Sequence, residues 1–65
     1  MLHYVVRNSS GFFYSYDANY FYPNLHDARI TTDEDYAIAL AQLARSSYPN
    51  AGVRVSAFRV EFSDV

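Results

Sequence analysis

The chain has 65 residues, a formal net charge of -2, no cysteine, seven tyrosines and five phenylalanines. This length allows one small domain over residues 1–65, and the lack of cysteine excludes a disulfide framework and a thiolate zinc site. All five cations are arginines in a chain of net negative charge, which disfavours direct binding to nucleic acid, and no apolar run reaches the length of a signal-peptide core or a membrane span.

The N-terminal part of the chain predicts a β-hairpin. A period of two over 2–7 is interrupted by four turn residues and resumes over 12–17. Gly11 is expected to adopt the positive φ that a short hairpin loop needs. A further short strand is expected over 20–22. It should end there, because Pro23 cannot donate a hydrogen bond to a strand ladder.

The clearest local signal is the start of a helix. Thr31 with Glu34, or Thr32 with Asp35, makes a capping box, and three consecutive carboxylates lie at the positive end of the helix dipole. We therefore expect a helix from this point to about Ser47. The residues that share its broad apolar face are Tyr36, Ala37, Leu40, Leu43, Ala44 and Tyr48.

Two segments flank this helix in the sequence. The connector over 23–30 is expected to contain one short helical turn, and the last strand is expected over 53–62, beside the first strand. The apolar phase of the last strand switches at residues 57–58, which predicts a β-bulge or, alternatively, a far end buried on both faces by a partner. The element order predicts an α+β fold, an antiparallel three- to four-stranded sheet (β-β-α-β) with one helix packed on one face.

The segment 12–22 is unusually aromatic, with seven Phe or Tyr among its eleven residues. One helix covers only one face of a hairpin, so some large rings must be exposed. In one register Phe12, Tyr14 and Tyr16 face the helix and Phe13 is exposed with part of the next strand; the other register exposes the opposite set. The rings serve either as core and cross-strand pairs or as a recognition surface. The residues predicted to contact a partner are Phe13, Tyr20, Phe21, Tyr22 and Ile38.

Two alternatives accompany this recognition surface. Ile38 lies roughly opposite the apolar centre of the helix, so it is expected to contribute to a second contact area or to the interface of a homodimer. The aromatic hairpin is also suited to stacking the bases of a single-stranded nucleic acid or a nucleotide, but stacking sites of this kind carry cations, and only Arg7 and Arg29 lie near the hairpin in the sequence.

The candidate catalytic residues do not form a recognisable set. Carboxylates 33–35 are accounted for by helix capping, and consecutive residues entering a helix point in different directions, so no metal site is expected there. His3 and His26 are the only side chains suited to acid-base chemistry at neutral pH, and no nucleophile motif accompanies them. The sequence therefore predicts a protein that is not an enzyme and that binds no cofactor.

Four short strings define the pattern of the whole chain: YVVRN at 4–8, GFFYS at 11–15, LHDAR at 25–29 and TTD at 31–33, before an alanine-rich helix and a closing Val-x-Val strand. This pattern resembles small orphan bacteriophage-encoded β-β-α-β proteins of the host-takeover or anti-defence type. The resemblance implies an inhibitor that binds and blocks a host protein or ribonucleoprotein complex, such as RNA polymerase or a CRISPR interference complex, in the host bacterial cytoplasm. It transfers no functional residue.

Overall fold

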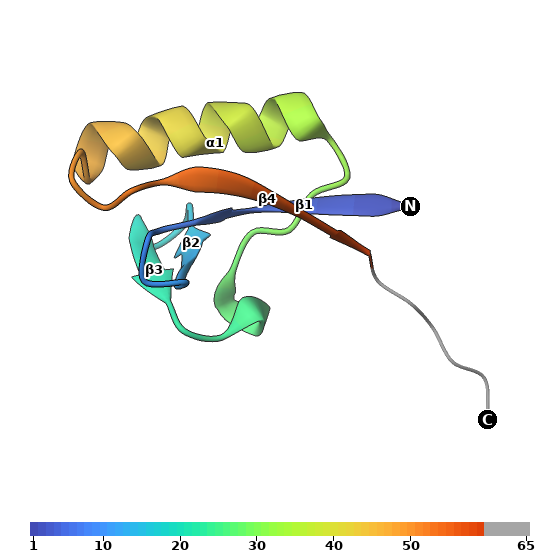
Figure 1. Cartoon of the computed structure of the whole chain (residues 1–65), viewed down its shortest axis with the longest axis horizontal. Helices are drawn as coiled ribbons and strands as arrows, with labels where there is room; N and C mark the ends of the chain where they lie inside the picture. The colour runs from blue at the N-terminus through green and yellow to red at the C-terminus, as the bar shows by residue number, and fades with distance from the viewer. Residues whose placement is uncertain (60–65) are drawn as a thin grey trace.

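Four antiparallel strands and one long helix make up residues 1–59, the part of the chain that the computed structural model describes (Figure 1). The sheet has the strand order β3-β2-β1-β4, and every pairing in it is antiparallel. The expected α+β fold is confirmed. The elements are β1 (Leu2–Arg7), β2 (Phe13–Ser15), β3 (Tyr20–Tyr22), the 3-10 helix η1 (Leu25–Asp27), α1 (Glu34–Ser47) and β4 (Arg54–Arg59).

The first hairpin has the expected β1 but a shorter β2 than the range 12–17. The side chain of Asn8 extends the loop, because its Oδ1 accepts hydrogen bonds from the backbone N–H groups of Ser10 and Phe12, at 3.0 and 2.9 Å. Gly11 has φ of 83°, as expected for this loop. Phe12 therefore belongs to the turn, and β2 begins one residue later.

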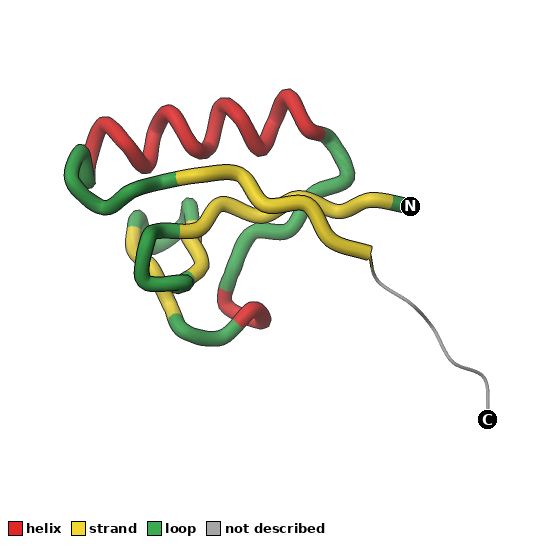
Figure 2. Tube along the Cα trace, viewed as in Figure 1, coloured by secondary structure: helices red, strands yellow, loops and turns green. Residues whose placement is uncertain are grey.

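The connector after β3 fills the space beside the first half of β1. Thr31 and Tyr4 exchange two backbone hydrogen bonds, of 2.7 and 3.1 Å, and Arg29 N–H donates to the Tyr14 carbonyl at 3.4 Å. The connector includes η1, the predicted short helical turn. Figures 1 and 2 show η1 on the side of the sheet away from α1. Val5, which alternates with the core residue Val6, is only 2% exposed, so this second face is partly covered as well.

The helix begins at Glu34 and not with either predicted capping box. Asp33 is the N-cap, and its Oδ1 accepts hydrogen bonds from the backbone N–H groups of Asp35 and Tyr36, at 3.0 and 3.2 Å. Thr31 Oγ1 instead accepts from Asp33 N–H, outside the helix. The helix ends where expected. No helix within residues 1–59 is both long and apolar enough to cross a membrane.

The face of α1 that packs on the sheet is narrower than predicted. Three of its four buried residues are alanines, which let the helix approach the strands closely. Tyr36 and Leu43 were expected on this face, but both are exposed on its flank. Ala41, which the prediction omitted, is fully buried. The buried residues of α1 are Ala37, Leu40, Ala41 and Ala44.

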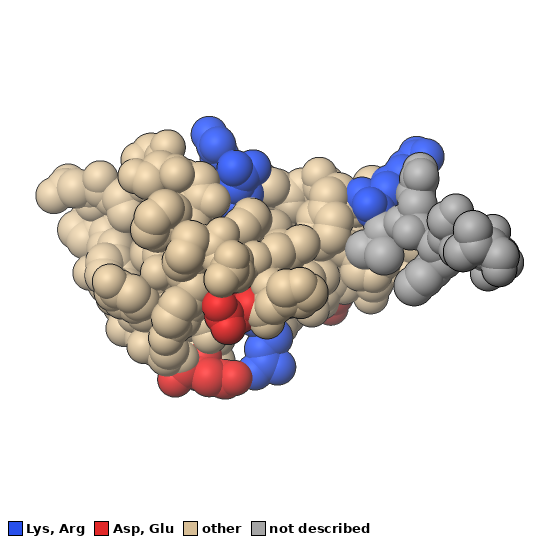
Figure 3. Space-filling view, turned by 90° about the horizontal axis from the view of Figure 1, so that it is seen from below, with Lys and Arg blue, Asp and Glu red and all other residues tan. Residues whose placement is uncertain are grey.

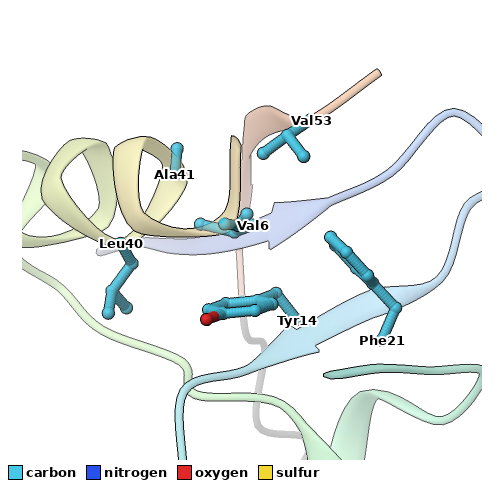
Figure 4. Close-up of a cluster of buried hydrophobic side chains, with 7 residues drawn as sticks. Val6, Tyr14, Phe21, Leu40, Ala41 and Val53 are labelled. Atoms are coloured by element: carbon cyan, nitrogen blue, oxygen red, sulfur yellow. The ribbon is translucent and has the colours of Figure 1, made fainter. Parts of the chain in front are cut away.

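The core lies between α1 and the sheet, as Figure 4 shows. Aromatic rings form much of it: the centroids of Tyr14 and Phe21 are 5.2 Å apart, and those of Phe21 and Tyr48 are 5.3 Å apart in an edge-to-face arrangement. The alternative registers of the hairpin are thereby resolved. Tyr14 is buried, whereas Phe12 and Tyr16 are exposed beyond the two ends of the short β2. The cluster comprises Val6, Tyr14, Phe21, Leu40, Ala41, Ala44 and Val53.

The strand β4 pairs with β1 in unbroken register from Leu2↔Arg59 to Arg7↔Arg54. The predicted bulge at residues 57–58 is therefore wrong. The apolar phase switches because Phe58 lies on the opposite face from Val55, with its ring centroid 5.8 Å from that of His3. The remainder of the predicted strand, beyond residue 59, lies outside the described residues.

The turn between α1 and β4 packs against the first hairpin loop. Ser9 N–H donates to the Ala51 carbonyl at 2.8 Å. Gly52 has φ of 68°, and a Cβ at this position would lie 2.8 Å from the Cβ of Ser9. Glycine is required here both by the backbone conformation and by the close approach of the two loops.

Candidate functional site

Three aromatic side chains form a row on the sheet face that points away from α1. Because Tyr14 and Phe21 face α1, their neighbours Phe13 and Tyr22 point the other way, and these two residues lie opposite each other across β2 and β3. Tyr20 is on the same face, and its ring centroid is 5.5 Å from that of Tyr22, with the ring planes at 77°. We call Phe13, Tyr20 and Tyr22 the aromatic row. Tyr20 is its most accessible member, 57% exposed.

Two arginines extend the aromatic row across the sheet. The guanidinium carbon of Arg7 lies 5.5 Å from the centroid of the Phe13 ring, within cation-π range. Arg7 pairs with Phe13 on one side and with Arg54 on the other, so the three side chains share one face. Arg7 Nε is buried without a hydrogen-bond partner among residues 1–59. The surface therefore combines flat apolar rings with two cations across four strands.

The charges seen from this side of the molecule are segregated. Figure 3 shows cationic side chains along the upper edge, and carboxylates with a further cation along the lower edge. An ion pair joins Arg29 Nη2 to the two carboxylate oxygens of Asp17, at 3.0 and 3.1 Å. Both side chains are largely exposed, so this pair contributes little stability, but it neutralises Arg29 as a binding cation.

The structure brings together three of the five residues predicted to contact a partner. Phe13, Tyr20 and Tyr22 form the aromatic row. Phe21 does not belong to it: this side chain is 7% exposed and packs between Tyr14 and Tyr48, so its assignment as a contact residue is wrong. Ile38 lies in the other layer, 42% exposed on α1, and is separate from the row.

A second feature, which the sequence did not predict, is an open hollow of about 550 Å³ between α1 and the turn from β2 to β3. Asn19 organises it, with φ of 48°. Its Oδ1 accepts from the hydroxyl of Tyr14 at 2.6 Å, its Nδ2 donates to Ser47 Oγ at 3.3 Å, and its carbonyl accepts from the hydroxyl of Tyr48 at 2.6 Å. The residues that line the hollow are Tyr14, Tyr16, Asp17, Asn19, Leu43, Ser46 and Ser47.

The hydroxyl of Tyr14 stays protonated in this setting. Burial raises the pKa of Tyr14, and the neighbouring Tyr48 and Tyr16 raise it further. The group therefore acts as a hydrogen-bond donor that fixes the turn. The only sequence signal for this arrangement was the turn over 17–19; that its asparagine would bond to a helix 28 residues away followed from no local pattern.

Neither histidine lies in a group of side chains that could hold a metal ion, in the part of the chain that the structure describes. His3 packs against Phe58, and its Nδ1 is buried without a hydrogen-bond partner among residues 1–59, whereas His26 is exposed in η1. Within the same residues no three His, Cys, Asp or Glu side chains come close enough together to hold a metal ion. No protein-family model, curated protein or solved structure matches the chain. Its function is therefore inferred from the aromatic row itself.

Proposed function

We propose that the chain is a non-enzymatic binding protein that uses the aromatic row to dock on a host protein or ribonucleoprotein complex. The observation that supports this is the contiguous set of three rings on the sheet face opposite α1, with Arg7 against Phe13. Tyrosine, phenylalanine and arginine are the residue types enriched at protein interfaces, and a few such anchors supply most of the binding energy.

The finer part of the proposal is inhibition of the target. It comes from the resemblance to small bacteriophage proteins that bind and block one host machine, such as RNA polymerase or a CRISPR interference complex. A sheet suits this role, because rings carried on paired strands are already held in place and lose little conformational entropy when they bind. The target complex would then be held in an inactive state without any chemical step.

The test is affinity capture from a bacterial lysate with the wild-type chain, Tyr20→Ala and Tyr16→Ala. Tyr16 is the matched control, because it is also an exposed tyrosine, at 48% against 57%, but lies at the hollow and outside the aromatic row. We expect the wild type and Tyr16→Ala to capture one stoichiometric complex and Tyr20→Ala to lose it. Thermal melts must show that both variants remain folded. Capture that survives Tyr20→Ala, or no capture by the wild type, contradicts the proposal.

A second candidate function, binding of single-stranded nucleic acid, is favoured by one specific observation. Arg54 lies beside Arg7 and in line with the aromatic row, although 47 residues separate the two arginines in the sequence. Base stacking on aromatic side chains contributes about 1–3 kcal/mol per base and is accompanied by cation contacts. Titration of labelled single-stranded DNA and RNA would show binding that weakens with salt and is lost in Tyr20→Ala. Absence of binding at low salt rejects this candidate.

A further inference from the structure

The outer edge of β4 is an unusually open sheet edge. Arg54–Arg59 form the last strand in the order β3-β2-β1-β4, and within residues 1–59 their backbone pairs only with β1. The strand has six residues in regular register, with no proline and no bulge, which are two of the devices that block edges. Its outward N–H and C=O groups can therefore accept a further strand by β-augmentation.

Three of the five arginines lie along this edge. Arg54 and Arg59 are exposed at the two ends of β4, about 17 Å apart at the usual rise of a strand. Arg45 reaches the same place from α1: its Nε and Nη2 donate to the carbonyl of Val53, just before the strand, at 3.3 and 3.1 Å. Because five positions separate them, Arg54 lies on the face of the sheet that carries the aromatic row and Arg59 on the face toward α1, so an incoming strand would meet a cation on each face.

The helix adds an apolar contact above this edge. Ile38 and Arg45 are seven residues apart, about two helical turns, so they lie on the same side of α1. Because Arg45 contacts the carbonyl that precedes β4, this side of α1 overhangs the β4 edge. Ile38 is 42% exposed there. A strand added to β4 would direct every second side chain toward Ile38.

A second copy of this chain is a poor occupant of the edge. If two β4 strands paired antiparallel about a two-fold axis centred on the strand, Arg54 of one copy would lie opposite Arg59 of the other. Like charges placed directly opposite each other destabilise strand pairing. An occupant that carries carboxylates faces no such repulsion.

We propose that the outer edge of β4 binds an acidic, extended segment of a partner protein as a fifth strand. Its carboxylates would lie against Arg54 on one face of the sheet and against Arg45 and Arg59 on the other, and an apolar side chain between them would pack under Ile38. This surface shares only Arg54 with the surroundings of the aromatic row, because it uses backbone pairing and lies at the edge and not on the face of the sheet.

The test uses three capped peptides of about eight residues, the usual length of a strand. The first, the Glu-Val peptide, has two Glu at each end and Val between them, so that a carboxylate lies on each face at both ends. The second has Lys in place of every Glu, and the third is the Glu-Val peptide N-methylated at every residue, so that neither of its edges can donate to a strand. Fluorescence anisotropy measures the affinity, and amide chemical shifts locate the binding. We expect the Glu-Val peptide to shift the amides of 54–59, and the other two to bind at least about tenfold more weakly.

Protein variants separate charge from position. Arg59→Glu should weaken the binding of the Glu-Val peptide at least about tenfold. Arg29→Glu changes the net charge by the same amount but away from β4, so it should change the affinity for this peptide little. Tyr20→Ala should leave the affinity for the Glu-Val peptide unchanged, because Tyr20 belongs to the aromatic row. A failure of the β4 proposal can therefore be distinguished from a failure of the proposed function. Three results would each overturn the proposal. They are equal binding of the N-methylated peptide, amide chemical-shift changes at the aromatic row in place of β4, and a dimer, detected by sedimentation, in which β4 is buried.

Discussion

The hydroxyl of Tyr14 holds the turn between β2 and β3, and Tyr14→Phe isolates the contribution of this one group. The hydroxyl donates to Asn19 Oδ1 at 2.6 Å, while the ring is 2% exposed and packs on Phe21. Phenylalanine preserves the packing and removes only the donor. Because Asn19 is exposed, water can take the freed acceptor. We therefore expect the free energy of unfolding to fall by about 1 kcal/mol, the usual net value of one hydrogen bond.

Thermal unfolding followed by circular dichroism measures this loss. In a domain of this size, about 1 kcal/mol corresponds to a decrease in Tm of roughly 4–8 °C. Tyr16→Phe is the control, because Tyr16 is exposed and its stability change should stay within about 0.5 kcal/mol. A Tm of Tyr14→Phe equal to that of the wild type would show that the hydroxyl contributes nothing to the fold.

A double-mutant cycle with Asn19→Gly tests whether the hydrogen bond is the cause. Glycine keeps the φ of 48° without strain but removes the acceptor. In that background Tyr14→Phe should cost nothing, which gives a coupling energy of about 1 kcal/mol. If the two losses simply add, the stabilising effect of Tyr14 has another origin.

Asp33→Ala should lower the free energy of unfolding by about 1 kcal/mol, because two amides of α1 lose their acceptor, while Asp33→Asn should cost much less; thermal melts compare the two. Gly52→Ala should cost more than about 1 kcal/mol in urea titrations, because φ of 68° is strained for alanine and its Cβ would meet that of Ser9 at 2.8 Å; Ser9→Gly should recover part of the loss. Above about pH 10 the unfolded chain releases the Tyr14 proton first, because burial raises the pKa of Tyr14 in the folded state. Stability should therefore fall as the pH rises above about 10, and less steeply in Tyr14→Phe.

The elements with strong local signals were predictable from the sequence. The alternation over 2–7 defined β1, and Gly11 marked the loop that follows it. The start of α1 was misplaced because three consecutive residues, Thr31, Thr32 and Asp33, are all good caps. The choice among them depends on Thr31, which is held by backbone pairing with Tyr4 and so cannot begin the helix. That pairing joins segments 27 residues apart and has no local sequence signal.

The candidate site was only partly predictable for the same reason. Which hairpin face is exposed follows from the pairing of Arg7 with Phe13, and this register is set by the side chain of Asn8, which lengthens the loop by one residue. Phe21 was placed on the wrong face because no local pattern shows that it pairs with the buried Tyr14 across β2 and β3. Arg54 lies beside Arg7 because of the register of β4 on β1, and composition and periodicity do not specify this register.

The pairing of β1 with β4 has a consequence for how the chain acquires its structure during translation. Leu2 pairs with Arg59, so the sheet's longest ladder closes a loop that includes every residue between them. The first hairpin and α1 can form locally, but β1 lacks its main partner until residue 59 has left the ribosome. Because non-local pairing slows folding, the chain should reach its native state only after β4 has emerged, and variants cut short before β4 should be degraded or aggregate.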